Sequence, residues 1–186
     1  MTPKNIVLLG SSGSIGRSTL DVIRNHLNRL KVLALAANSN LELLVEQFFE
    51  FRPEYVCLVD ESLRNRLNDR LKSEPVKILS GKDEMIELAS LKEADIVVNA
   101  IVGAAGLLAS YKAVKHNKTL ALANKESMVA AGPILRNEAA ESGAKIIPID
   151  SEHSAIFQII ESRPIDEIRN IILTASGGPF RNLPIE

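Results

Sequence analysis

Cysteine and aromatic residues are scarce in this sequence of 186 residues. Cys57 is the single cysteine, so no internal disulfide can form and a reducing compartment, the cytoplasm, is expected. There is no Trp, with two Tyr and five Phe, and the Lys and Arg residues are dispersed along the chain. This composition argues against the basic, aromatic surface of a protein that binds nucleic acid.

Long hydrophobic runs are also lacking. The longest apolar stretch, residues 96–109, is too short to cross a bilayer and is interrupted by Asn99 and by glycines. Only four apolar residues precede Gly10 after the polar start of the chain, so no secretory signal is predicted. A content of 46% hydrophobic and 24% charged residues is that of an ordinary globular protein without membrane association.

Short β-branched runs alternate with helical patterns along most of the chain. Strands are predicted at residues 6–9, 32–36, 55–59, 76–79, 96–98, 119–121 and 145–149. Helical spacing of apolar residues occurs at 41, 44, 45, 48 and 49, again at 63, 67 and 71, and over 128–142, which Gly143 closes. The alternation predicts an α/β fold with a doubly wound, mainly parallel, Rossmann-like sheet.

The alternation ends near Pro148, where a domain boundary is predicted. Residues 1–148 would form the Rossmann-like domain, and residues 149–186 would begin an α+β catalytic domain. In this second part we expect a helix over 154–161, a strand over 170–175 and a turn at 176–179. Independent domains rarely fall below about 40 residues, so we expect this second domain to be incomplete at Glu186.

A glycine-rich loop follows the first predicted strand and opens the first helix. Residues 10–16 read GSSGSIG, with the spacing Gly-x-x-Gly-x-x-Gly. Glycines allow the backbone to approach a pyrophosphate, and the free N–H groups at a helix N-terminus bind its charge. A tight turn without a ligand is the alternative, but the serines supply donors that a turn does not need. The loop therefore predicts a dinucleotide site.

The end of the second strand indicates which dinucleotide would bind. An NAD site usually has Asp or Glu about 20 residues beyond the glycines, which binds the ribose 2′-OH. Here the segment is Ala-Ala-Asn38-Ser39-Asn40, with no acidic residue. A carboxylate would repel a 2′-phosphate, whereas Asn and Ser can donate hydrogen bonds to one. The segment favours NADPH over NADH.

Two further segments carry polar groups at predicted strand ends. Lys125 follows the strand 119–121 within ANKES, where Asn124 can also cap a helix and Glu126 can lie in its first turn. Asp150 and Glu152 follow the strand 145–149, and in an extended segment they would project to the same side. Two convergent carboxylates suit Mg²⁺ or Mn²⁺, and the alternative is a solvated turn whose acids complement the next helix.

Five motifs occur in order along the chain. They are GSSGSIG at 10–16, AIVGAAGL at 100–107, LANKES at 122–127, DSEH at 150–153 and SGGPF at 176–180. Together they resemble the N-terminal half of the 1-deoxy-D-xylulose 5-phosphate reductoisomerase family. The resemblance implies NADPH- and Mg²⁺- or Mn²⁺-dependent conversion of that sugar phosphate to 2-C-methyl-D-erythritol 4-phosphate, in non-mevalonate isoprenoid biosynthesis. It also implies a homodimer for the full-length enzyme.

The resemblance assigns roles to residues of this sequence. The pyrophosphate of the cofactor would contact Ser12, Gly13, Ser14 and Ile15. Its adenosine ribose and phosphate would contact Asn38, Ser39 and Asn40, and its nicotinamide side would contact Asn124 and Glu126. Asp150 and Glu152 would be metal ligands, and Lys125 and Glu152 would be catalytic. Substrate would contact Lys125, Ser151, Glu152 and Ser176. His153 is better interpreted as a helix-start or packing residue than as a metal ligand.

Two other functions stay open from the sequence. One is a non-catalytic NADP-binding or interaction module that has lost its enzyme half. The presence of Lys125, Asp150 and Glu152 argues against it, because a pure cofactor binder has no use for them. The other is a different nicotinamide enzyme, such as one like homoserine dehydrogenase, in which the motifs at 150–153 and 176–180 would have no role.

Overall fold

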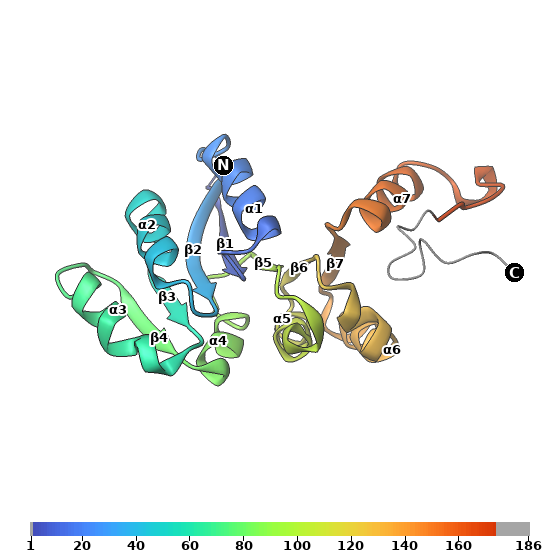
Figure 1. Cartoon of the computed structure of the whole chain (residues 1–186). Helices are drawn as coiled ribbons and strands as arrows, with labels where there is room; N and C mark the ends of the chain where they lie inside the picture. Colours follow the sequence, from blue (N-terminus) through green and yellow to red (C-terminus); the bar gives the residue numbers. More distant parts are fainter. Residues whose placement is uncertain (1, 174–186) are drawn as a thin grey trace, which may run out of the picture.

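The computed structural model describes residues 2–173 of the chain, and one parallel sheet organises them (Figure 1). All of its neighbouring strands pair in parallel, in the order β4-β3-β2-β1-β5-β6-β7. The strands are β1 (Lys4–Leu9), β2 (Leu30–Ala37), β3 (Tyr55–Leu58), β4 (Lys77–Ser80), β5 (Ile96–Asn99), β6 (Thr119–Leu122) and β7 (Lys145–Pro148). The seven predicted strands and the doubly wound α/β fold are confirmed.

The order of the strands creates a topological switch point beside β1. The chain first builds outward from β1 through β2 and β3 to β4, and then returns to place β5 on the other side of β1. The connections after β1 and β5 therefore leave the sheet in opposite directions and open a crevice at the carboxyl ends of the strands. Ligands of open α/β sheets bind in such a crevice.

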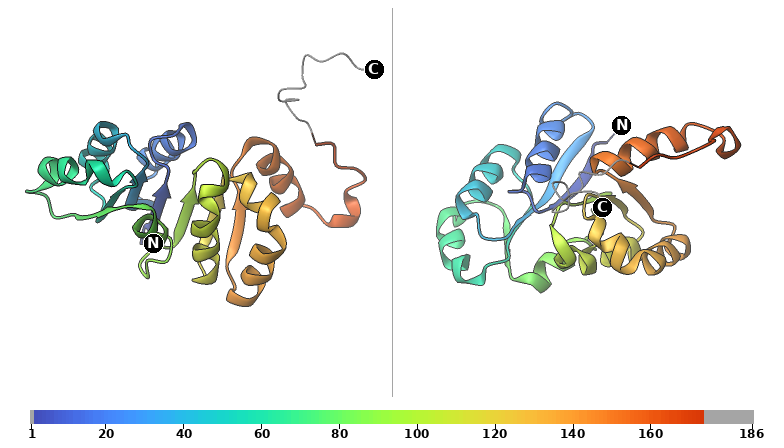
Figure 2. Two further views of the ribbon diagram at one scale, coloured as in Figure 1. Left: turned by 60° about the horizontal axis from the view of Figure 1, so that its bottom comes forward. Right: turned by 45° about the vertical axis from the view of Figure 1, so that its right-hand side comes forward.

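Helices cover both faces of the sheet (Figures 1 and 2). The core on one face includes side chains of the first three helices, and the core on the other includes side chains of the next three. In β1, Ile6 and Leu8 point into the first core while Val7 and Leu9 point into the second. This burial on both faces explains the continuous apolar runs of the strands. The helices are α1 (Ser14–Arg24), α2 (Leu41–Phe51), α3 (Arg64–Leu71), α4 (Lys82–Leu88), α5 (Leu107–Lys115) and α6 (Lys125–Ser142).

The apolar stripes predicted for α2 and α3 face the core, with one exception. Leu44 and Phe48 of α2 are buried, as is Leu67 of α3, but Phe49 is 43% exposed. Phe49 lies at the edge of the buried stripe, where the guanidinium of Arg52 lies 4.9 Å from its ring centroid. The expectation that Phe49 lies on the buried face is therefore wrong, and its ring instead makes a cation–π contact with Arg52 at the surface.

Helix α6 extends further than its apolar spacing predicted. Asn124 caps its start, since its side chain accepts a hydrogen bond from the N–H of Ser127, and Gly143 ends it with φ of +78°. Ala131 has non-helical backbone angles, two residues before Pro133. Proline removes one helical hydrogen bond and its ring crowds the preceding turn, which accounts for the kink.

The segment after β7 differs from the prediction. Helix α7 (Ser151–Glu161) begins three residues earlier than expected, and it lies beside the β7 edge of the sheet (Figure 2). Residues 170–173 are exposed and pair with no strand among residues 2–173, so the predicted strand is wrong over this part. Unpaired strand backbone has no partner for its hydrogen bonds. Residues 174–175, the turn at 176–179 and Ser176 lie outside the described residues.

Candidate functional site

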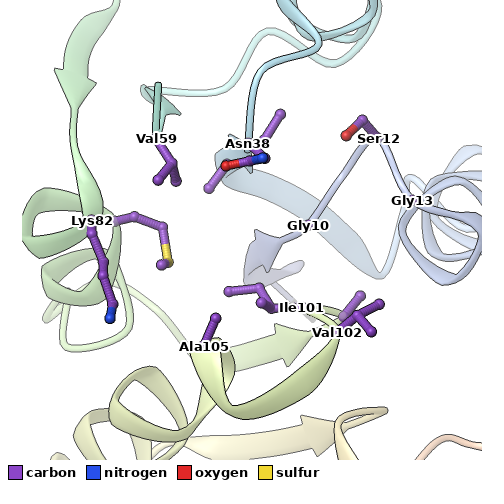
Figure 3. A pocket seen from close by; sticks show the side chains of 13 residues that line it. Gly10, Ser12, Gly13, Asn38, Val59, Lys82, Ile101, Val102 and Ala105 are labelled. Carbon is purple, nitrogen blue, oxygen red and sulfur yellow. The ribbon is translucent and has the colours of Figure 1, made fainter. Parts of the chain in front are cut away.

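A cavity of about 430 Å³ lies at the carboxyl ends of the strands, at the switch point (Figure 3). Residues that follow β1, β2, β3, β4 and β5 all contribute to its wall, so the cavity follows five neighbouring strand ends. Its lining is mostly small or apolar, and consists of Gly10, Ser12, Gly13, Ala36, Ala37, Asn38, Val59, Lys82, Met85, Ala100, Ile101, Val102 and Ala105.

The glycine loop is held against the strands on either side of β1. The N–H groups of Gly10 and Ser11 both donate to the carbonyl of Ala36, at 2.9 and 2.8 Å. Gly10 has φ of +86°, and a Cβ there would lie 2.8 Å from the carbonyl oxygen of Ala100. At Gly16 a Cβ would lie 2.2 Å from the carbonyl oxygen of Gly10. These two glycines are thus required by packing, whereas a Cβ at Gly13, which also lines the cavity, would meet only the carbonyl oxygen of Gly10 at 3.4 Å.

A buried glutamine of α2 also holds the loop. Gln47 donates from its side-chain Nε2 to the carbonyl of Ser11 over 3.0 Å. Both Gln47 and Ser11 are buried, so the bond is shielded from competing solvent. The path of the loop is consequently set by α2 as well as by β1.

The N-terminus of α1 has no side-chain cap and lies beside the cavity. Gly13 is its N-cap, and the first N–H groups of a helix lack partners within the helix. Ser12 and Gly13 line the cavity, whereas Ser14 and Ile15 are exposed in the first turn of α1 and lie outside its lining. The N–H groups of the first turn of α1 and the positive end of its dipole therefore lie beside the cavity, where they favour an anion.

The polar residues after β2 divide into two groups. Asn38 lines the cavity and its carbonyl accepts a hydrogen bond from the N–H of Asp60. Ser39 and Asn40 are exposed beyond it, and the Oδ1 of Asn40 caps α2 by accepting from the N–H of Leu43 at 3.2 Å. Asn40 is thus already engaged on one side of its amide.

Asn124, predicted to contact cofactor, is buried and hydrogen-bonded within the protein. Its side chain is 2% exposed, and its Nδ2 donates to the carbonyls of Ile101 and Gly103, each at 2.5 Å. Its Oδ1 accepts from the N–H and the hydroxyl of Ser127. The amide therefore positions the loop after β5, two of whose residues, Ile101 and Val102, line the cavity. Glu126 is exposed and lies outside the lining.

Asn99 completes this buried network from the end of β5. Its Nδ2 donates to the carbonyl of Gly106 and to the hydroxyl of Ser110, both at 2.8 Å, and its Oδ1 accepts from the N–H of Ile101. A Cβ on Gly106 would lie 2.9 Å from Asn99 Nδ2. The sequence reasoning did not single out Asn99, because a polar residue at a strand end gives no signal of its partners.

A second cavity, of about 590 Å³, lies beyond the ends of β6 and β7. It brings together Lys125, Asp150 and His153, three of the residues from the predicted motifs. The remaining lining is largely apolar and comes from β6, α6, β7 and α7: Leu122, Met128, Val129, Arg136, Ile146, Pro148, Ile156, Phe157 and Ile160. Ser151 and Glu152 are exposed and do not line it.

The expectation that Asp150 and Glu152 lie in one extended segment and project to the same side is wrong. Asp150 is the N-cap of α7 and Glu152 lies in its first turn, so the two are not in one extended segment. Because a helix turns by about 100° per residue, side chains two positions apart point to different sides. Among residues 2–173 no group of three or more His, Cys, Asp or Glu side chains is arranged to hold a metal ion.

Asp150 is held as a carboxylate by the start of α7. Its Oδ1 accepts from the N–H of His153 at 3.2 Å and contacts His153 Nδ1 at 2.6 Å. Burial opposes its ionisation, but these hydrogen bonds and the charges of His153 and Lys125 outweigh it, so the pKa of Asp150 is below its ordinary value. His153 lies in the first turn of α7, so the predicted position at a helix start is confirmed.

Several residues of the first cavity were missed from the sequence. Val59 follows β3, and Lys82 and Met85 lie on α4, which follows β4. Dinucleotide motifs are usually sought after β1 and β2, so the ends of these later strands gave no signal. Their place next to the glycine loop depends on the sheet order, which brings residues about 70 positions apart together. Only a correct topology could have found them.

The fold and the site define a Rossmann-like, doubly wound α/β protein whose glycine loop leads into a helix N-terminus suited to binding an anion. The sequence profile of 1-deoxy-D-xylulose 5-phosphate reductoisomerase matches residues 6–132, and that of the C-terminal domain of the same enzyme matches residues 146–186. The chain belongs to the 1-deoxy-D-xylulose 5-phosphate reductoisomerase family.

Individual relatives agree with this assignment. The reductoisomerase of Thermodesulfovibrio yellowstonii is 51% identical over 96% of this chain and 46% of its own length, and that of Chlorobaculum tepidum is 47% identical over 98% and 48%. The chain thus spans about half the length of the curated relatives it matches.

Solved structures show the same likeness. The Zymomonas mobilis reductoisomerase in complex with NADPH superposes with a TM-score of 0.89 at 41% identity, covering 99% of this chain and 48% of that one. A reductoisomerase in complex with NADPH, fosmidomycin and magnesium gives a TM-score of 0.80 at 42% identity, covering 83% and 38%. In the part of this chain that the structure describes, no helix is long and apolar enough to cross a membrane.

Proposed function

We propose that the protein takes part in the NADPH- and divalent-metal-dependent conversion of 1-deoxy-D-xylulose 5-phosphate to 2-C-methyl-D-erythritol 4-phosphate. Residues 1–148 would bind NADPH, and residues 149–186 would begin the catalytic domain. The observation that carries the proposal is the cavity at the switch point, lined by Ser12 and Gly13 at the uncapped start of α1. Reductoisomerases of the same fold are solved with NADPH and with magnesium.

The chain's own groups fit a dinucleotide phosphate. The open N–H groups at the start of α1 would bind the pyrophosphate, with Ser12, Ser14 and Ile15 in the surrounding turn. Asn38, with Ser39 and Asn40 beyond it, would surround the adenosine ribose. Among residues 2–173 no carboxylate lines the cavity, so nothing in this lining repels a 2′-phosphate, which supports NADPH over NADH.

The nicotinamide end would lie toward the loop after β5 and the start of α6. Asn124 would act there through its hold on Ile101 and Gly103, and Glu126 would contact the cofactor from the helix start. Nicotinamide supplies the hydride, so the protein's task is to position the ring and the substrate.

Asp150 and Glu152 would hold Mg²⁺ or Mn²⁺, since both are carboxylates and hard divalent cations prefer oxygen ligands. One oxygen of Asp150 is already bound to His153, which leaves Oδ2 for a cation. The metal would supply Lewis-acid stabilisation of negative charge on substrate oxygens. Lys125, which lines the second cavity with Asp150, would contact the substrate with Ser151, Glu152 and Ser176.

For the whole protein we propose a cytoplasmic homodimer, on the family resemblance. Sedimentation of a chain that carries both halves would test the dimer, and a monomer at micromolar concentration would contradict it.

Calorimetric titration of the chain with NADPH and with NADH tests the cofactor. We expect NADPH to bind more tightly, and absence of binding or equal binding of the two would refute the cofactor assignment. Turnover is tested in a chimera that joins residues 1–186 to the C-terminal half of the Thermodesulfovibrio yellowstonii relative. NADPH oxidation that depends on the sugar phosphate and on Mg²⁺ is expected. A folded chimera that binds NADPH without turnover would favour a non-catalytic NADP-binding module.

A further inference from the structure

Of the residues that the structure describes, Lys82 is the single one with an ionisable side chain in the lining of the first cavity. It is the first residue of α4, directly after β4, and its side chain is exposed at the cavity wall. Figure 3 shows its amine on the side of Ala105, across the cavity from Ser12 and Gly13. Within residues 2–173 it forms no salt bridge.

The turn before Lys82 directs α4 across this end of the cavity. Gly81 has φ of +98°, and a Cβ there would lie 2.7 Å from Glu61 Oε1. Glycine is therefore required at the turn both by its backbone angle and by the close approach of the Glu61 side chain. One helical turn later Met85 also lines the cavity, so Lys82 and Met85 belong to the same face of α4.

The acidic groups near this turn do not cancel the lysine charge at the cavity wall. Asp60 and Glu61 follow β3, Asp83 and Glu84 follow Lys82 in the first turn of α4, and none of the four lines the cavity. Asp60 Oδ1 is occupied by the N–H and the hydroxyl of Ser62, at 3.0 and 2.6 Å. Glu84 Oε2 accepts from the N–H of Ser80 at 2.6 Å, and the Glu61 carboxylate lies against Gly81.

We propose that Lys82 determines the specificity of the cavity for a dinucleotide that carries a 2′-phosphate. The inference rests on the proposed NADPH binding and goes beyond it, because it names the charge that discriminates. Asn38 and Ser39 can donate hydrogen bonds to the phosphate, but they leave its negative charge without a counter-charge. Lys82 supplies it as a mobile point charge on a long, exposed stem.

Titration of four proteins with two pairs of ligands tests the inference: the unaltered chain, Lys82→Met, Lys82→Arg and the control Lys77→Met. Lys77 is the first residue of β4, at the amino end of the strand that Lys82 follows, and it lies outside the cavity with its Nζ 5.8 Å from the ring centroid of Tyr55. The ligands are NADPH with NADH, and adenosine 2′,5′-bisphosphate with AMP. Circular dichroism checks that each variant is folded.

We expect Lys82→Met to weaken NADPH and adenosine 2′,5′-bisphosphate about tenfold, equivalent to about 1.4 kcal/mol, and to change NADH and AMP less than twofold. Lys82→Arg and Lys77→Met should keep the preference of the unaltered chain. Because the site is exposed, the effect of Lys82→Met should shrink as salt is raised from about 0.01 to about 0.15 M.

Three outcomes separate this inference from the proposed function. If the unaltered chain prefers NADPH and Lys82→Met keeps the same preference, the role of Lys82 is overturned while the proposed NADPH binding stands. Equal weakening of NADPH and NADH by Lys82→Met would also overturn it, because the lysine would then contact a part that both share. An unaltered chain that binds neither dinucleotide would remove both proposals.

Discussion

The glycine loop offers a pair of substitutions that should separate packing from binding. In Gly16→Ala the new methyl would lie 2.2 Å from the carbonyl oxygen of Gly10 and 2.7 Å from the Cα of Ser11, so the backbone must shift. In Gly13→Ala the nearest atom is the carbonyl oxygen of Gly10, at 3.4 Å, and φ of −74° is allowed for alanine. The first substitution should damage the fold and the second should damage the cavity.

The two costs can be estimated separately. Gly16→Ala gains about 1 kcal/mol of helix propensity but overpacks a backbone contact, which costs up to about 3 kcal/mol or more. A net loss of about 2 kcal/mol would lower the melting temperature by roughly 4–8 °C for a chain of this size. Gly13→Ala exchanges a favourable N-cap residue for a poor one, which costs at most about 1 kcal/mol.

Thermal unfolding followed by circular dichroism, together with NADPH titration, would measure both effects. We expect Gly13→Ala to melt within about 4 °C of the unaltered chain and to bind NADPH at least tenfold more weakly, because Gly13 lines the cavity and a methyl group there would take up space beside the start of α1. The reasoning would be refuted if Gly16→Ala melted like the unaltered chain. It would equally be refuted if Gly13→Ala bound NADPH with unchanged affinity.

Three other predictions concern stability and reactivity. Asn99→Ala leaves buried partners unsatisfied and should destabilise the chain by about 2–3 kcal/mol, and a urea midpoint equal to that of the unaltered chain would contradict this. The pKa of Asp95 is lowered chiefly by the hydrogen bond from the N–H of Asn5, so its stabilisation is present above the ordinary aspartate pKa and is lost as pH falls below it. Because the Asp95 side chain is 38% exposed, Asp95→Asn should cost only about 1 kcal/mol of stability at pH 7. The variant should also lose less stability on acidification than the unaltered chain, and an equal loss in both would exclude this role. Burial raises the pKa of the Cys57 thiol to about 12, so a thiol reagent at pH 8 should react slowly with the folded chain and rapidly in urea, and similar rates in both would show that the thiol is accessible.

The fold could be predicted from the sequence because its signals are local. Burial on both faces makes the runs around Val7 and Val97 continuously apolar, and the helical spacing of Leu44 and Phe48 records one covered face. Signals at the end of the chain were weaker. The run after Asn170 has the β-branched residues of a strand, but pairing needs a neighbour, and residues 170–173 have none among the described residues. The early start of α7 was missed because Asp150 suited an N-cap and a metal ligand equally well.

By itself, the sequence determined the parallel α/β class, the glycine loop after β1, the absence of an acid after β2 and the family motifs. Each of these depends on residues that are close together in the chain. Only the tertiary structure decided which groups share a cavity. It separated Gly10 and Gly16, where a Cβ would collide with backbone, from Gly13, where it would not, and it brought Lys82 to the cavity at the switch point. The physical reason is that strand order, and not distance along the chain, sets which strand ends meet.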